Sequence, residues 1–88
     1  MTTTPQEERV QAVMALWKDL LPFALPENYR LNLWVMSHSL EVVLYAIKEV
    51  SLKRVKVNNQ MTPEQAIRLV GAICASVARA RKHLAAAK

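Results

Sequence analysis

The sequence predicts an all-α fold, a compact bundle of four helices that forms a single domain over residues 1–88. Glycine occurs once in the 88 residues, which disfavours tight β-hairpins because they need residues that tolerate unusual backbone angles. Hydrophobic residues make up 52% of the chain and charged residues 22%, a balance typical of globular proteins. A chain of this length can bury one hydrophobic core but not two.

The first helix is expected over residues 5–21. Thr4 can cap its free backbone N–H groups, and Pro5 suits the first helical position because no donor is needed there. Apolar residues then recur at helical spacing until Pro22 ends the helix, and these residues are Val10, Val13, Trp17, Leu20 and Leu21. This apolar stripe is expected to face the core.

A short second helix is expected over residues 26–36, opened by Pro26 and Glu27. It carries two of the aromatic side chains of the chain. We expect all the aromatic residues to pack in the core, because a domain this small needs large side chains to close it. They are Trp17, Phe23, Tyr29, Trp34 and Tyr45.

The third helix is expected over residues 39–57. Ser39 can cap it, and the carboxylate of Glu41 complements the helix dipole in the first turn. Residues 40–47 are apolar on most sides, which predicts that this helix is the central element and is buried by the others. Its second half turns polar and basic and ends at Asn58-Asn59.

The fourth helix is expected over residues 63–85, and it begins with the same punctuation as the first, since Thr62 precedes Pro63. At 100° per residue, one stripe of this helix is apolar and consists of Ala66, Val70, Ile73, Val77 and Leu84. The opposite side carries Arg68, Arg79, Lys82 and His83, separated by the small residues Ala72 and Ala75. The prediction is a flat, basic outer face.

Charge is divided unequally along the chain. Residues 1–45 carry three basic and five acidic residues, a net charge of −2, whereas residues 46–88 carry nine basic and two acidic residues, a net charge of +7. Such asymmetry in a small domain indicates a surface for a polyanion. We therefore predict a non-catalytic nucleic-acid-binding or replication-associated accessory module, with DNA favoured over RNA.

The residues predicted to contact phosphates lie on the last two helices and are Lys53, Arg54, Lys56, Arg68, Arg79 and Lys82. If these helices pack antiparallel, the end of the third lies near the start of the fourth, so the first three residues approach Arg68. A simpler interpretation is that basic residues near helix C-termini complement the dipole and keep the surface soluble. The alternative function is a small helical interaction module, such as an adaptor, inhibitor or homodimer, whose basic face meets an acidic protein.

Other functional classes have little support in the sequence. Cys74 is the sole cysteine, so it has no internal disulfide partner, and a buried structural thiol is expected. Two histidines are too few to indicate a metal site, and no catalytic signature accompanies them. We expect no enzyme activity and no cofactor. No stretch approaches a membrane span and residues 1–4 do not look like a signal peptide, so we expect no membrane partner and a cytoplasmic protein.

One third of the chain carries a family resemblance. Trp34 in the short helix precedes the run Leu40-Glu41-Val42-Val43-Leu44-Tyr45-Ala46-Ile47-Lys48-Glu49. This ordering resembles the helical domains of phage and plasmid replication proteins related to DnaD. The resemblance implies a DNA-binding or helicase-loader-contacting accessory module. The family's closing tyrosine-to-tryptophan motif is missing, since residues 65–74 contain Ala66-Ile67-Arg68-Leu69-Val70 instead, and no site residue is carried over.

Overall fold

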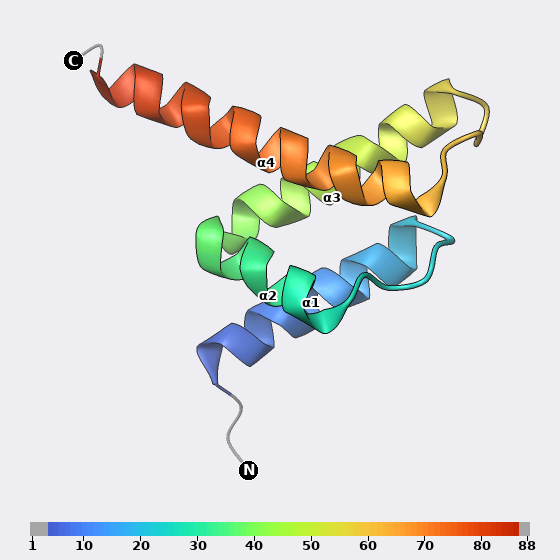
Figure 1. The fold of residues 1–88 in the computed structure, drawn as a ribbon, viewed down its shortest axis with the longest axis horizontal. Coiled ribbons are helices and arrows are strands. Elements are labelled where there is room, and N and C mark those ends of the chain that lie inside the picture. Colours follow the sequence, from blue (N-terminus) through green and yellow to red (C-terminus); the bar gives the residue numbers. More distant parts are fainter. Residues whose placement is uncertain (1–3, 87–88) are drawn as a thin grey trace.

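The computed structural model describes residues 4–86, with side chains up to residue 81. It consists of four α-helices, α1 (Pro5–Leu20), α2 (Asn28–Ser37), α3 (Leu40–Lys56) and α4 (Pro63–Ala86), and the described residues contain no strand. The all-α prediction is therefore confirmed. The molecule is flat, with extents of 41 × 41 × 17 Å. In the face-on view, α3 and α4 cross each other above the α1–α2 pair (Figure 1).

The predicted helix starts are confirmed where a hydroxyl side chain provides the cap. The Oγ1 of Thr4 accepts a hydrogen bond from the Glu7 N–H at 3.1 Å, and the Oγ of Ser39 accepts one from the Val42 N–H at 3.4 Å. Each bond satisfies one of the backbone donors that a helix N-terminus leaves free. Both ends of α1, α3 and α4 lie within one residue of the predicted ends.

The start of α2 differs from the prediction. The helix begins at Asn28 and not at Pro26, because Glu27 is extended, with φ −61° and ψ 147°, and occupies the N-cap position. Its backbone carbonyl accepts the first bonds of the helix from the N–H groups of Arg30 at 3.0 Å and Leu31 at 3.2 Å. Pro26 is buried in the connection before the helix, so this proline helps to anchor the loop and does not open the helix.

Helix α3 is the central element, as predicted, because it packs against α4 on one side and against α1 and α2 on the other. Val43, Ala46 and Ile47 are fully buried at these contacts. The expectation that the other helices cover α3 on most sides is only partly correct. Tyr45 is 49% exposed, and Leu52 and Val55 further along the same side are also exposed.

The aromatic residues divide into two groups. Trp17 and Trp34 pack in the core with ring centroids 6.4 Å apart, and the Trp17 indole N–H donates a hydrogen bond to the Phe23 carbonyl at 3.2 Å. The core prediction was wrong for Tyr29, which is 61% exposed, and for Tyr45. Tyr29 lies on the side of α2 opposite the buried Leu31, because the two positions are 200° apart around the helix.

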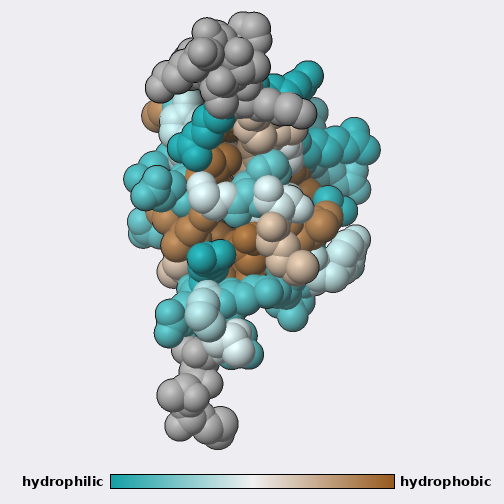
Figure 2. All heavy atoms as spheres, turned by 90° about the vertical axis from the view of Figure 1, so that its left-hand side faces the viewer, coloured by the Kyte–Doolittle hydropathy of each residue, from teal (hydrophilic) through white to brown (hydrophobic). Residues whose placement is uncertain are grey.

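Apolar side chains also remain at the surface elsewhere. Figure 2 shows hydrophobic side chains gathered in the middle of the face that looks left in Figure 1, with hydrophilic ones around them. On α2, Leu33 and Met36 are exposed together with Tyr29 and continue one ridge at helical spacing. This helix is thus apolar on both its buried and its exposed side.

Candidate nucleic-acid interface

The end of α3 reverses the chain through a Schellman turn. The Asn59 N–H donates to the Arg54 carbonyl at 2.8 Å, and the Asn58 N–H donates to the Val55 carbonyl at 3.1 Å. Asn58 and Asn59 adopt φ values of 56° and 62°, the left-handed conformation that asparagine tolerates better than most residues. The turn satisfies backbone carbonyls at the helix end and directs the chain toward α4.

The start of α4 is closed by a reciprocal capping box. The Oγ1 of Thr62 accepts a hydrogen bond from the Gln65 N–H at 3.2 Å, and the Gln65 Oε1 accepts one from the Thr62 N–H at 3.0 Å. Two backbone donors are satisfied within the motif. The arrangement fixes where α4 begins, so that its first turns lie beside the last turns of α3.

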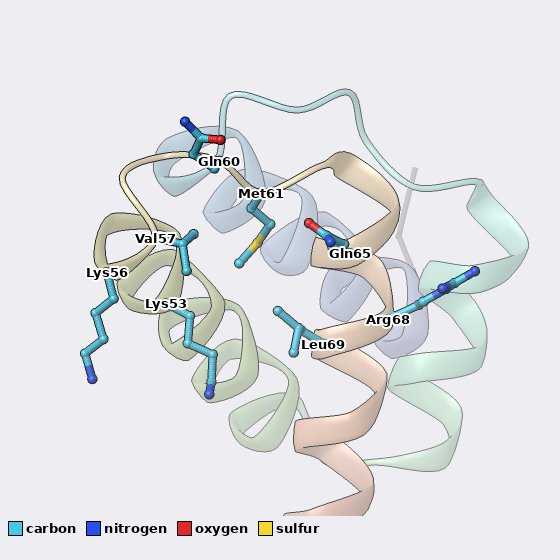
Figure 3. A pocket seen from close by; sticks show the side chains of 8 residues that line it. All are labelled: Lys53, Lys56, Val57, Gln60, Met61, Gln65, Arg68 and Leu69. Atoms are coloured by element: carbon cyan, nitrogen blue, oxygen red, sulfur yellow. The ribbon is translucent and has the colours of Figure 1, made fainter.

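A groove of about 620 Å³ opens between these two helix ends. Its lining brings Lys53 and Lys56 of α3 together with Arg68 of α4, as the predicted antiparallel arrangement requires. All three side chains are exposed. The complete lining consists of Lys53, Lys56, Val57, Gln60, Met61, Gln65, Arg68 and Leu69 (Figure 3).

The charged side chains point in different directions. In Figure 3, the two lysines extend from α3 on one side of the groove, whereas Arg68 extends from the far side of α4 toward α2. Arg68 also lines a second hollow with Arg30, Glu64 and Ile67. The structure therefore places Lys53 and Lys56 along the α3 edge of the groove, whereas Arg68 continues the positive charge across α4 toward Arg30, which the sequence interpretation did not include.

Arg54 lies apart from this groove. It is half-buried, and its guanidinium carbon lies 5.9 Å from the centroid of the Phe23 ring, in cation–π geometry. The contact connects α3 to the loop after α1. Of the three basic residues predicted at the end of α3, only Lys53 and Lys56 line the groove.

The remaining predicted residues lie further along α4. Arg79 is exposed and follows Arg68 by eleven residues on the same side of the helix, a separation of about 16 Å along the axis. The side chain of Lys82 lies outside the described residues. Arg81 is exposed and lines a hollow with Glu41, which comes from the start of α3.

The apolar floor of the groove was missed by sequence reasoning. It consists of Val57, Met61 and Leu69, which come from the helix end, the loop and the second turn of α4. Leu69 lies to one side of the predicted apolar stripe of α4. An apolar residue outside the stripe was the sequence feature that could have indicated this floor. Val57 and Met61 flank a turn, where periodicity gives no information about which side chains meet.

Cys74 is fully buried in the core, as expected for a structural thiol. Burial raises the pKa of this thiol from about 9 to about 11, because the charged thiolate loses its hydration. Within the described part of the chain, no three His, Cys, Asp or Glu residues come close enough to hold a metal ion. The same residues include no helix long and apolar enough to cross a membrane.

Comparisons of the chain with models of known protein families, with curated proteins and with solved structures found no match. A functional assignment therefore depends on the groove and its charged edges. The resemblance to DnaD-related domains stays a prediction from the sequence.

Proposed function

We propose that this chain is a non-catalytic nucleic-acid-binding or replication-associated accessory module whose basic residues contact phosphates. The observation that supports this proposal is that Lys53, Lys56 and Arg68 are all exposed and line one groove, so positive charge extends across the adjoining ends of two helices. Exposed cations on adjoining elements add their fields and attract a polyanion. Lysine and arginine contacts to phosphates release counterions, so the binding is salt-dependent and independent of sequence.

Arg79 supplies a further contact in this proposal. It lies on the same side of α4 as Arg68, and the residues between them on that side include the small Ala72 and Ala75. Small side chains leave room for a nucleic-acid backbone to approach the helix. Arg54 is assigned a packing role instead, because its guanidinium is half-buried against Phe23.

A paired charge reversal tests the proposal. The variant Lys56→Glu/Arg79→Glu removes two proposed phosphate contacts from the two helices. Its control, Arg9→Glu/Lys18→Glu, changes the net charge by the same amount at two exposed positions of α1. Fluorescence anisotropy with duplex DNA over a range of salt concentrations measures the slope of log K against log salt.

The expected slope of the Lys56/Arg79 variant is shallower by about 1.8, because each phosphate that the protein no longer neutralises lowers the slope by about 0.9. The control keeps the wild-type slope because α1 makes no proposed contact. Circular dichroism of both variants checks that they are folded. Equal slopes for the two variants would show that binding depends on net charge alone, and the proposed interface would then be wrong.

A further inference from the structure

The groove between the end of α3 and the start of α4 has a feature that phosphate contacts do not use. Its floor is apolar, formed by Val57, Met61 and Leu69, and these side chains remain only partly covered. Val57 is 48% exposed. Phosphate oxygens gain nothing from apolar side chains, whereas an apolar partner that covers them removes their surface from water.

The two lysines of the groove border this floor on one side. Figure 3 shows Lys53 and Lys56 along the α3 side of the groove, next to Val57. On the opposite edge, the Gln65 carboxamide oxygen is already used by the Thr62 N–H. A partner that fits therefore carries apolar side chains in its centre and carboxylates along the edge that faces the lysines.

The backbone around the groove determines the form of the partner. Both walls are helices, whose backbone groups bond internally, and the capping box satisfies the N–H groups of Thr62 and Gln65 at the start of α4. The described residues contain no strand, so the groove walls provide no sheet edge on which an extended peptide could add a strand. A helix suits such a groove, because it satisfies its own backbone and needs no backbone partner from the walls.

We infer that this groove binds an acidic amphipathic helix of a partner protein. Apolar residues at i, i+4 and i+7 of that helix contact Val57, Met61 and Leu69, and carboxylates beside them face Lys53 and Lys56. A methionine in the floor suits this role, because its flexible thioether side chain adapts to different apolar surfaces. The inference depends on the apolar floor, so it stands or falls separately from the phosphate contacts of α4.

Two synthetic helical peptides of about 16 residues, long enough to form a helix once bound, provide the probe. Both carry leucines at i, i+4 and i+7, and they differ only in whether glutamates or lysines flank the leucines. Binding is measured by anisotropy, and amide chemical shifts locate it on the protein. The glutamate peptide is expected to bind at least about tenfold more tightly than the lysine peptide, with the largest shifts at Val57, Met61 and Leu69.

Substitutions in α3 and at its C-cap residue Val57 provide matched controls. Val57→Gln is expected to weaken the glutamate peptide about fivefold, because the variant offers the peptide less apolar surface to cover. Val55→Gln removes the same side chain from an even more exposed position, 63% exposed and outside the groove, and is expected to change nothing. For charge, Lys56→Glu is the corresponding test variant and Lys48→Glu is its control, since Lys48 is exposed on the same helix but does not line the groove.

Several outcomes would overturn the inference. Equal binding of the two peptides, shifts away from the groove, or equal effects of the two valine variants would each do so. The inference would also be wrong if a second copy of this chain occupied the groove. Sedimentation would then show a dimer that Val57→Gln converts to a monomer. Failure of the two proposals is distinguishable, because Val57→Gln is expected to leave the salt slope for DNA unchanged and Arg79→Glu to leave peptide binding unchanged.

Discussion

Single side chains in this molecule show how strongly environment controls chemistry. Cys74 is a nucleophile by residue type, yet it is fully buried among apolar residues of the core. Burial raises the pKa of its thiol to about 11, so the thiol remains protonated throughout the physiological range. Its role is therefore packing, and its reactivity reports on opening of the fold.

The first prediction concerns this thiol. Above pH 9 the unfolded chain loses the Cys74 proton before the folded chain does, because the folded pKa is the higher one. Stability should therefore fall between pH 9 and pH 11, by roughly 1.4 kcal/mol per unit of pKa difference. Urea unfolding of the wild type and of Cys74→Ala at pH 8 and at pH 10.5 measures this loss of stability. Parallel losses in both proteins would contradict the prediction, as would rapid alkylation of the native thiol at pH 8.

Helix ends explain most of what the sequence predicted correctly at the level of elements. Thr4, Ser39 and Thr62 each cap a helix with the side chain that marked the start in the sequence. The α2 start was misplaced because Pro26 is acceptable both at the first helical position and in an extended connection. Local chemistry identifies a cap, but it does not identify which of two permitted conformations the packing selects.

The second prediction belongs to the turn after α3. Asn58 has φ 56°, so Asn58→Ala should destabilise the protein by about 1 kcal/mol, because a Cβ without a compensating polar group disfavours this conformation. Asn58→Gly should be neutral or slightly stabilising. Chemical denaturation of both variants provides the comparison, with Gln60→Ala as the control in the same exposed loop. Similar losses for alanine and glycine at position 58 would contradict the assignment.

The third prediction belongs to α4. Gly71 lies inside this helix without a positive φ, and a Cβ added there would meet nothing within 4 Å. Gly71→Ala should therefore stabilise the protein by about 0.5–1 kcal/mol, because it restricts the unfolded chain and favours the helix. The reverse change, Ala75→Gly, should cost a similar amount one turn later. Destabilisation by Gly71→Ala in urea unfolding would show that this side of α4 is occupied.

At the scale of the whole molecule, the apolar run of residues 40–47 predicted that α3 is the central helix, but the sequence pattern did not predict which surfaces remain exposed. Tyr29 and Tyr45 were expected in the core, yet they lie opposite the buried sides of α2 and α3. Each of these helices is apolar on two sides, so spacing alone could not decide which side faces inward. Only the relative placement of all four helices settles it, and that information lies in contacts between residues distant in the sequence.

The candidate site likewise has features that the sequence predicted and features that it did not. The approach of Lys53 and Lys56 to Arg68 could be predicted, because a short connection between two long helices favours antiparallel packing. The exclusion of Arg54 could not, since its contact with Phe23 joins two segments that are 31 positions apart in the sequence. The apolar floor was equally hidden, because its members come from three consecutive but differently structured segments.

The proposed function combines the two surfaces into one arrangement. In this proposal, basic residues at the α3–α4 end and along α4 contact a nucleic-acid backbone, while the apolar floor between the helices binds an acidic helix of a partner. Lys53 and Lys56 border both surfaces. We therefore expect bound peptide to weaken DNA binding, and linkage requires DNA to weaken peptide binding by the same factor.

The central claim is that the basic residues of α3 and α4 contact nucleic-acid phosphates. Its most direct test is a titration of the wild-type protein with duplex DNA, in which fluorescence anisotropy measures binding at several salt concentrations. With Lys53, Lys56, Arg68 and Arg79 in contact with phosphates, we predict a dissociation constant on the order of 10⁻⁴–10⁻⁶ M at physiological salt and a slope of about −3.6 in log K against log salt. Absence of binding at low salt, or binding that salt does not weaken, would contradict the claim.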